Sequence, residues 1–315
     1  MASEDLRGVI FILCGMFIFS VQDVLIRQLA DGGSLLQVLT FRGLLGAIVL
    51  TIFLRITGRS LTLVTPYPLL AVTRVILFFS GFLCFYYALS HMRLAEATAL
   101  FFASPLFITA ISRLVLKEAV GWYRLGATIV GFVGVLFIVQ PSPDNLNLIA
   151  LFPLFTACTY SISMMIARYT KEQETIWQQM MYLYIGSVVF GGVASATLLW
   201  AGIGETQLPS AGYIVRQWNF SEQYILLIML IVAIIGSFGM LLLTSAYRVG
   251  TPAVIAPFEY SLLFLAGAWG YLFYGEVPNL YSFLGMSMIV SSSLFIFFRE
   301  GVRKKPLAVK TSLRT

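Results

Sequence analysis

The stretch ALSHMRLA at residues 88–95, followed by LVLKE at 114–118, decides the fold because the chain repeats its pattern. The second version reads AYRVGTPA at 246–253 and YLFYGE at 271–276. Three matched pairs are each 158 positions apart, namely Ala88/Ala246, Ala95/Ala253 and Glu118/Glu276. This constant spacing indicates one structural unit that is written twice.

The opening segments of the two units match as well. FSVQDVLIR at 19–27 aligns with YSISMMIAR at 160–168 at a spacing of 141. The spacing then grows by 17 residues, mostly through the long connection at 202–221, whose partner at 57–66 is half as long. The residues paired by the first spacing include Ser20/Ser161 and Arg27/Arg168.

The composition requires a membrane. Of the 315 residues, 59% are hydrophobic and 11% are charged, and the mean hydropathy is +0.90, so one soluble core cannot bury the apolar side chains. A spanning helix needs about 20 mostly apolar residues, and continuous apolar runs favour helices over a barrel. Ten such segments are predicted, at residues 8–29, 35–56, 67–89, 94–116, 121–140, 148–168, 175–200, 223–247, 251–274 and 280–298.

The predicted fold is therefore an all-α polytopic membrane protein in which ten transmembrane helices form two inverted five-helix repeats. Because five is an odd number, the second repeat must enter the bilayer upside down. The first repeat covers 8–140, the second covers 148–298, and a basic cytoplasmic tail covers 299–315. The first apolar run has no small-residue cleavage site before it ends, so we expect an uncleaved span. The segment at 141–147, with its two prolines, is a connector or a hinge.

The distribution of Lys and Arg predicts the orientation. With the N-terminus inside, fifteen of the twenty basic residues fall in inner loops and ends, and two lie within the membrane. The three that fall outside are Arg27, Arg93 and Arg216. The positive-inside bias therefore places both termini in the cytoplasm. The net charge of +6 is explained by this bias and indicates no nucleic-acid partner; a lipid-binding patch is the alternative role of the tail.

Four ionisable side chains lie inside predicted spans, where a charge costs about 2.5–3.5 kcal/mol and normally faces protein or water. Asp23 and Arg42 both lie about 9–10 Å below the outer surface and can pair. Arg74 and Glu259 share an inner depth and form a second expected pair, although their two spans need not be neighbours. These charges either neutralise each other and fix register, or they line a central cavity. In that cavity Arg42 or Arg74 contacts an anionic group, and Asp23 or Glu259 contacts a cationic group or carries a proton. Glu276 is expected near solvent at a helix end, so Glu259→Gln should impair transport more than Glu276→Gln.

Aromatic and amide side chains supply the rest of a possible binding surface. Most aromatics in spans serve packing or interface belts, and an amide in lipid needs partners that a neighbouring helix can also provide. The candidate substrate-binding residues are Gln22, Asp23, Arg42, Arg74, Tyr86, Tyr160, Gln178, Tyr182, Glu259 and Tyr260. Asp23 and Glu259 are also the candidates for proton coupling.

Signals of catalysis are weak. The single histidine, His91, falls in a short outer connection, and no phosphate-binding P-loop or dinucleotide-binding glycine motif is present. The three cysteines have no paired spacing, so no disulfide and no metal site are predicted. We expect neither an enzyme nor a cofactor.

The chain resembles the EamA branch of the drug/metabolite transporter superfamily over residues 8–298. The resemblance rests on the duplicated halves, on FRG at 41–43, and on the stretches YYALSHMRLAEATALFFASPLF at 86–107 and AYRVGTPAVIAPFEY at 246–260. It implies a ten-helix fold with a cavity between the halves, built from the first four helices of each. It also implies packing or dimer contacts through the fifth helix of each half, and hence a possible homodimer. The long connection at 202–221 departs from the short loop usual in the family.

These features predict a secondary transporter in the bacterial cytoplasmic membrane that moves a small organic metabolite by rocking its two halves. Family members export amino acids and metabolites or import riboflavin or S-adenosylmethionine, and the aromatic and amide lining slightly favours compounds of the last two kinds. The alternatives are a passive channel or a structural membrane scaffold, and then a membrane enzyme.

Overall fold

The computed structural model describes residues 3–114, 121–140, 148–170, 172–249 and 255–302, and within these ranges every regular element is a helix. The first half contains α1 (Ser3–Gln28), η1 (Leu29–Asp31), α2 (Leu35–Ile56), α3 (Pro68–Leu89), α4 (Leu94–Phe101), α5 (Ser104–Leu114) and α6 (Trp122–Val139). The second half contains η2 (Leu148–Ala150), α7 (Leu151–Tyr169), α8 (Ile176–Trp200), η3 (Pro209–Ala211), α9 (Gly212–Val215), α10 (Gln223–Val249), η4 (Ala256–Tyr260), α12 (Ser261–Tyr274) and α13 (Leu280–Val302).

Eight helices in the described ranges are long and apolar enough to cross a membrane, which confirms the all-α, multi-pass class. The other two predicted spans are shorter. The apolar part of α6 covers only Leu125–Val139, and span nine is divided into η4 and α12. The count of ten spans and the inverted arrangement stay predictions. The hinge or connector at 141–147 and most of the tail, from residue 303, lie outside the described residues.

Two predicted spans are broken near their middles. Span four bends at Phe102 and Ala103, between α4 and α5. Pro105 accounts for this break, because proline has no N–H for the helical bond to residue 101 and its ring crowds that carbonyl. Span nine changes from the 3-10 turn η4 to α12 at Tyr260, with Pro257 in the first turn of η4. Both breaks bring aromatic side chains to the centre of the molecule.

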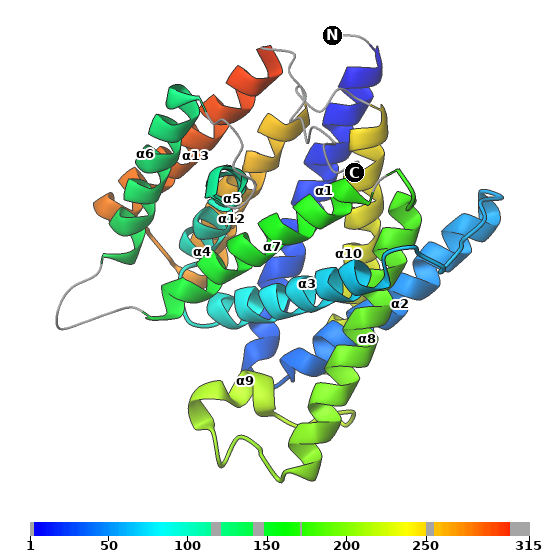
Figure 1. Cartoon of the computed structure of the whole chain (residues 1–315). Coiled ribbons are helices and arrows are strands. Elements are labelled where there is room, and N and C mark those ends of the chain that lie inside the picture. Colours follow the sequence, from blue (N-terminus) through cyan, green and yellow to red (C-terminus); the bar gives the residue numbers. More distant parts are fainter. Residues whose placement is uncertain (1–2, 115–120, 141–147, 171, 250–254, 303–315) are drawn as a thin grey trace.

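The long helices pack in pairs, and each pair joins a helix of the first half to a helix of the second half. Helix α1 lies along α10, and α3 lies along α7 (Figure 1). Helix α2 packs on α8, and α6 packs on α13 at one edge of the molecule (Figure 1). The short helix α4 packs against α12. Each half is therefore held mainly by the other half.

Small residues allow these close approaches. A Cβ added at Gly134 of α6 would lie 2.8 Å from the carbonyl oxygen of Gly285 on α13, and the reverse contact would measure 2.5 Å. Close backbone approach of this kind supplies van der Waals contact where lipid removes the hydrophobic driving force. By contrast, a Cβ added at Gly267 of α12 would meet nothing within 4 Å.

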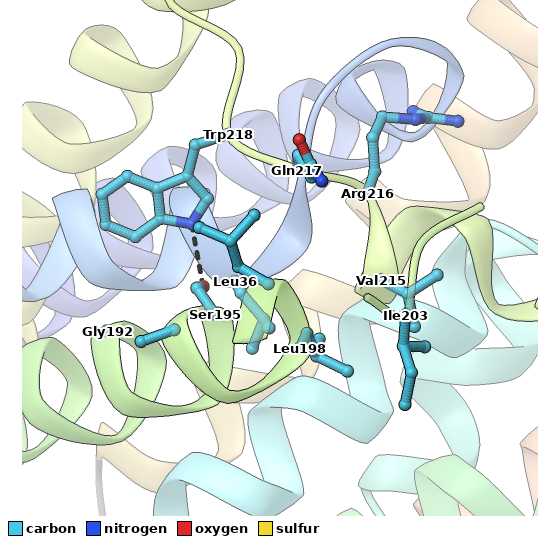
Figure 2. A pocket seen from close by; sticks show the side chains of 11 residues that line it. Leu36, Gly192, Ser195, Leu198, Ile203, Val215, Arg216, Gln217 and Trp218 are labelled. Carbon is cyan, nitrogen blue, oxygen red and sulfur yellow. Dashed lines mark hydrogen bonds between the residues drawn. The ribbon is translucent and has the colours of Figure 1, made fainter. Parts of the chain in front are cut away.

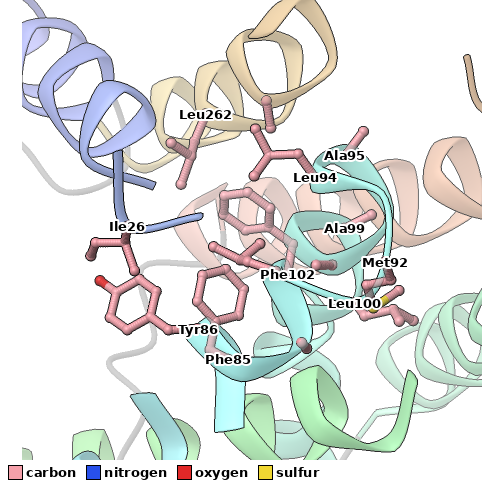
Figure 3. Packing of buried hydrophobic residues seen from close by; sticks show 14 of the residues in the cluster. Ile26, Phe85, Tyr86, Met92, Leu94, Ala95, Ala99, Leu100, Phe102 and Leu262 are labelled. Carbon is pink, nitrogen blue, oxygen red and sulfur yellow. The ribbon is translucent and has the colours of Figure 1, made fainter. Parts of the chain in front are cut away.

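The centre of the core surrounds α4, whose residues from Leu94 to Leu100 are all buried. Figure 3 shows Leu94, Ala95 and Ala99 of this helix beside Phe102 and Leu262, with Phe85 and Tyr86 below. Packing at this point therefore fixes α4 between α3 and α12. We use "outer end" for the end of the molecule where α1 ends and α2 begins, following the predicted topology, and "inner end" for the opposite one.

Candidate functional site

A buried phenol organises the first group of predicted site residues. Tyr86 of α3 is 1% exposed, and its hydroxyl accepts hydrogen bonds from Gln22 Nε2 of α1 at 2.9 Å and from Arg42 Nη1 of α2 at 2.8 Å. Asp23 is 7% exposed, and its charge acts on both Arg42 and Tyr86. We call Gln22, Asp23, Arg42 and Tyr86 the outer cluster. Three helices of the first half thus bring four predicted residues together.

The expected pairing of Asp23 with Arg42 takes an indirect form. Within the described ranges neither side chain forms an ion pair, and Arg42 bonds Tyr86 instead. The guanidinium also lies 5.6 Å from the ring centre of Phe82. In addition, Gln22 Oε1 is buried and has no hydrogen-bond partner in the described part of the chain. The outer cluster therefore contains hydrogen-bond acceptors and a guanidinium that do not pair with one another.

A second group surrounds Tyr160 of α7. The charges of Glu259, on η4, and of Arg74, on α3, both act on the Tyr160 hydroxyl. Arg74 is 8% exposed, and its Nε has no partner among the described residues. The charge of Glu174 also acts on Arg74. We call Arg74, Tyr160 and Glu259 the inner cluster; a direct pairing of Arg74 with Glu259 stays a prediction.

An aromatic bridge connects the two clusters. Phe85 lies 5.6 Å from Tyr86 and 5.6 Å from Phe101, measured between ring centres. Phe101 in turn lies 5.2 Å from Tyr160, edge to face. Such edge-on contacts are a preferred arrangement of aromatic pairs. The bridge makes the two clusters parts of one central region formed by α1, α2, α3, α4, α7 and η4.

Tyr260 lies at the break in span nine and faces the break in span four. Its ring centre is 4.8 Å from that of Phe102. Both rings are at least nine-tenths buried. Tyr260 is thus close to the aromatic bridge, in a packing contact between the two broken spans.

The last two predicted residues, Gln178 and Tyr182, lie near the start of α8 at the inner end. Gln178 Nε2 donates to the Val64 carbonyl at 2.8 Å and to the Tyr182 hydroxyl at 2.7 Å. Tyr182 donates to the Leu63 carbonyl at 3.3 Å. They make no hydrogen bond or ring contact with either cluster within the described ranges. Their contacts fasten the connection between α2 and α3 instead.

Glu276 differs from its expected place near solvent. Its side chain is 14% exposed and pairs with Arg27, also 14% exposed, at 2.6 Å. The second carboxylate oxygen accepts the Leu94 N–H at 3.0 Å, which satisfies an otherwise free donor at the start of α4. Gly275 has a φ of 64° and ends α12 in a turn where Glu276 N–H bonds the Gly270 carbonyl. That turn directs the carboxylate inward and explains the difference.

Ser163 of α7 and Ser261 of α12 were missed by sequence reasoning. Both hydroxyls are buried, and neither has a partner in the described part of the chain. The repeat offered a signal for one of them, since Ser163 lies 141 positions after Gln22. Serine is too common in helices for composition alone to identify the other.

The outer loop between α8 and α10 forms a separate pocket of about 330 Å³ (Figure 2). Apolar residues such as Leu36, Leu198 and Val215 line it, and Trp218 donates to Ser195 at its rim. The pocket contains none of the predicted site residues. We regard it as a peripheral groove and place the candidate site at the two clusters.

Arg216 anchors the same loop. Its guanidinium donates to both carboxylate oxygens of Glu205, at 3.0 and 2.9 Å, and to the carbonyls of Ala30 and Gly33. The hydrogen bonds and charge of Arg216 lower the pKa of Glu205, and Glu205 raises the pKa of Arg216. The loop is therefore tied to the first half next to the end of α1.

The two clusters consist of hydrogen-bonding and charged side chains of several kinds. Among the described residues no group of three or more His, Cys, Asp or Glu side chains is placed to hold a metal ion. Amides, phenols, carboxylates and guanidinium groups are instead suited to hydrogen bonding of a polar organic molecule.

Comparison with known proteins gives consistent matches. Residues 6–140 match the model of the EamA-like transporter family. The chain is 25% identical over 305 residues to the S-adenosylmethionine uptake transporter of Rickettsia prowazekii, which covers 97% of this chain and 96% of the relative. It is 30% identical over 246 residues to the riboflavin transporter of Rhizobium johnstonii, covering 76% and 74%. A pseudopaline exporter of Pseudomonas aeruginosa is 24% identical over 285 residues, covering 90% and 93%.

A solved crystal structure has a similar fold. It superposes with a TM-score of 0.60 over 95% of this chain and 99% of the other, at 13% sequence identity. At this identity the likeness concerns the arrangement of helices alone.

Proposed function

Because the chain belongs to the EamA-like transporter family, whose named relatives are transporters and not enzymes, we propose that it is a secondary transporter for a small organic metabolite. It moves this substrate across the cytoplasmic membrane by alternating access, with both termini in the cytoplasm. The central site consists of the outer and inner clusters and the aromatic bridge between them.

One observation carries the alternating-access part of the proposal. Gln37 is the third residue of α2, and Gln178, 141 positions later, is the third residue of α8. Gln37 Nε2 donates to the Asn219 carbonyl of the second half, and Gln178 Nε2 donates to the Val64 carbonyl of the first half. Equivalent amides thus fasten a loop of the opposite half, one at each end of the molecule. This exchange is what two inverted repeats produce.

The helix contacts support the same arrangement. If α1, α2 and α3 correspond to α7, α8 and α10, then the contact of α1 with α10 corresponds to that of α3 with α7. The contacts of α2 with α10 and of α3 with α8 also exchange, while α2 with α8 and α6 with α13 each correspond to themselves. The pattern is that of a two-fold relation between the halves. In this arrangement α6 and α13 remain at the edge, where a homodimer contact is expected.

The site residues favour a substrate with polar groups at its ends and a planar part between them. Buried charges inside a membrane protein are costly and mark substrate or ion pathways. Asp23 and Glu259 are the groups that carry a proton if transport is proton-coupled. S-adenosylmethionine and riboflavin, the compounds named for two relatives, each combine a planar ring system with polar groups.

Counterflow in proteoliposomes tests the proposal. Vesicles loaded with one unlabelled candidate compound should accelerate uptake of the same labelled compound, because an alternating carrier returns faster when loaded. Uptake that does not respond to internal compound would show a passive channel, and no flux of any family substrate would favour a structural scaffold. Repeating uptake with an imposed pH gradient, in the native protein and in Glu259→Gln, tests proton coupling.

A further inference from the structure

Resting on the proposed function, we propose that the outer cluster binds a zwitterionic head group in which an ammonium and a carboxylate sit on neighbouring atoms, as in an α-amino acid. Asp23 and the Gln22 amide oxygen take the ammonium, and Arg42 takes the carboxylate.

The acceptor side of the outer cluster is formed by two consecutive residues of α1. Gln22 is 1% exposed and Asp23 is 7% exposed. Gln22 gives its N–H to Tyr86 and keeps Oε1 without a partner among the described residues. A buried acceptor that stays unpaired costs about 1–3 kcal/mol, and more when it is charged. An ammonium group has three N–H donors and can serve both acceptors at once.

The donor side is Arg42. A guanidinium has five N–H donors in a planar fork, and one edge of this fork can hold a carboxylate through two parallel hydrogen bonds. Arg42 uses Nη1 for Tyr86, and its guanidinium also lies over the rings of Phe82 and Tyr86. Ring faces attract the cation without consuming its in-plane donors. The side chain therefore retains donors for an anionic group.

The two sides lie close together, and both pack beside a glycine of α10. Gln22 Nε2 and Arg42 Nη1 bond the same Tyr86 oxygen, so they are at most about 6 Å apart. At Gly236 of α10, an added Cβ would overlap Gln22 Oε1 and lie 3.3 Å from Arg42 Nε. The amide oxygen and the guanidinium thus converge where α10 has no side chain. A compact group that carries both charges matches this separation.

Ligands with one charge fit less well. A lone carboxylate on Arg42 would lie near the Asp23 carboxylate, and a lone cation on Asp23 would lie near the guanidinium, so each would meet repulsion. A neutral ligand would leave the opposite charges without direct partners. Only a ligand with both charges gives each side its counterion, which is how specificity arises from unpaired groups.

Matched probes test this assignment in the purified full-length protein. S-adenosylmethionine carries both groups, its decarboxylated form keeps only the amine, and methylthioadenosine has neither. Methionine, methionine amide and N-acetylmethionine form a second series. We expect the loss of either group to weaken binding at least tenfold, measured by competition with a labelled member of the series that binds.

Variants of Arg42 and Asp23 test which residue binds the carboxylate of the probe and which binds its amine. In Arg42→Gln, removing the carboxylate from the probe should cause less than a threefold further loss. In Asp23→Asn, removing the amine should cause less than a threefold further loss, while the carboxylate still matters. Arg299→Gln, which alters a cation over Tyr123 at 3.7 Å, is the control that should preserve the full discrimination. Circular dichroism and gel filtration verify that each variant is folded, and Arg42→Lys, which keeps the charge, should recover part of the carboxylate preference.

The inference is overturned if no probe with both groups binds the native protein, if both groups can be removed without loss, or if the discrimination persists in the two variants. Counterflow separates these results from the proposed function. Exchange of riboflavin without zwitterion discrimination would contradict the head-group assignment and leave the transporter proposal standing, whereas an absence of exchange for every compound would contradict transport itself.

Discussion

The outer and inner ends of the molecule use equivalent glutamines in different hydrogen-bond arrangements. At the outer end Gln37 makes two backbone hydrogen bonds with Asn219, both at 3.1 Å. At the inner end Gln178 bonds one backbone carbonyl and the neighbouring Tyr182. The outer end also has the Arg27–Glu276 ion pair and the Arg216 anchor. The comparison teaches that a repeated scaffold provides two similar fastenings, which differ in the groups that each glutamine contacts.

The described part of the inner end has polar contacts of its own. Thr65 donates to Glu174 at 2.5 Å, which joins the connection between α2 and α3 to the start of α8. Gln179 donates to Thr170 and to Glu174. Because Glu174 also acts on Arg74 of the inner cluster, we infer that closure at this end is linked to the central site, whereas the outer ion pair stands apart from it.

Breaking the outer ion pair should have the largest effect. Arg27→Ala leaves a mostly buried Glu276 carboxylate without its counterion, and loss of one partner of a buried pair costs about 3–5 kcal/mol. We expect a lower unfolding temperature and at least a tenfold loss of uptake. The charge-swapped pair Arg27→Glu with Glu276→Arg should recover part of both.

Arg93→Ala is the matched control for Arg27→Ala. Arg93 pairs with Glu96 three residues away at 2.9 Å, and its side chain is 40% exposed. Glu96 is only 12% exposed, but water reaches the Arg93 side of this pair, so Arg93→Ala should lose less stability than Arg27→Ala. Equal effects of the two alanine variants on unfolding and uptake would show that the Arg27–Glu276 pair does not close the outer end.

Removing the central phenol should have the second largest effect. Tyr86→Phe leaves the donors of Gln22 and Arg42 unpaired, at a cost of about 1–3 kcal/mol. Tyr160→Phe should cost less, because the Tyr160 hydroxyl has no hydrogen-bond partner among the described residues while its ring contact with Phe101 survives. Chemical unfolding of both variants, with uptake measured in parallel, makes the comparison; a larger loss in Tyr160→Phe would reverse the ranking of the clusters.

Truncating Gln37 or Gln178 should cost less stability than the preceding changes, and the two variants should open opposite ends of the molecule. Each hydrogen bond contributes about 0.5–1.5 kcal/mol, so Gln37→Ala should lose slightly more stability than Gln178→Ala. Gln37→Ala should increase labelling of an engineered cysteine at the outer end, and Gln178→Ala should increase labelling at the inner end. Changes in labelling at the same end in both variants would contradict their equivalence.

Acidification should have the smallest effect. Arg216 lowers the pKa of Glu205 in the folded loop, so the stabilisation by this pair is present above the usual Glu pKa and is lost as the pH falls through the lowered value. Fluorescence of Trp218, which bonds Ser195 near this loop, should change in that acidic window. Arg216→Gln should remove the transition, and an unchanged transition in that variant would assign it to another group.

Much of the fold follows from the sequence because lipid imposes simple rules. Apolar runs long enough to span a bilayer predicted eight of the helices, and the repeat spacing predicted the equivalence of the halves that Gln37 and Gln178 support. The breaks at Phe102 and Tyr260 were not predicted, since a proline inside an apolar run bends a helix only where neighbours accept it.

The site was predicted in part for a similar reason. Because burying a charge in lipid is costly, the sequence pointed to Asp23, Arg42, Arg74 and Glu259 as candidate site residues. These residues do lie around Tyr86 and Tyr160. Sequence depth alone suggested a direct pair of Asp23 and Arg42, because it carries no information on the phenol that Arg42 contacts instead. The sequence placed Glu276 near solvent because it did not reveal the turn at Gly275. The geometry of that turn depends on the tertiary contact with Leu94.

Reciprocal accessibility of the two ends tests alternating access most directly. In a background without Cys14, Cys84 and Cys158, cysteines at positions 37 and 219 can lock the outer end when a reducible bifunctional thiol reagent joins them. Cysteines at 64 and 178, joined in the same way, can lock the inner end. With the outer lock formed, a membrane-impermeant reagent should label inner positions only, transport should stop, and reduction should restore it; the inner lock should give the mirror result. Simultaneous labelling from both sides, or continued flux through either locked form, would contradict the account.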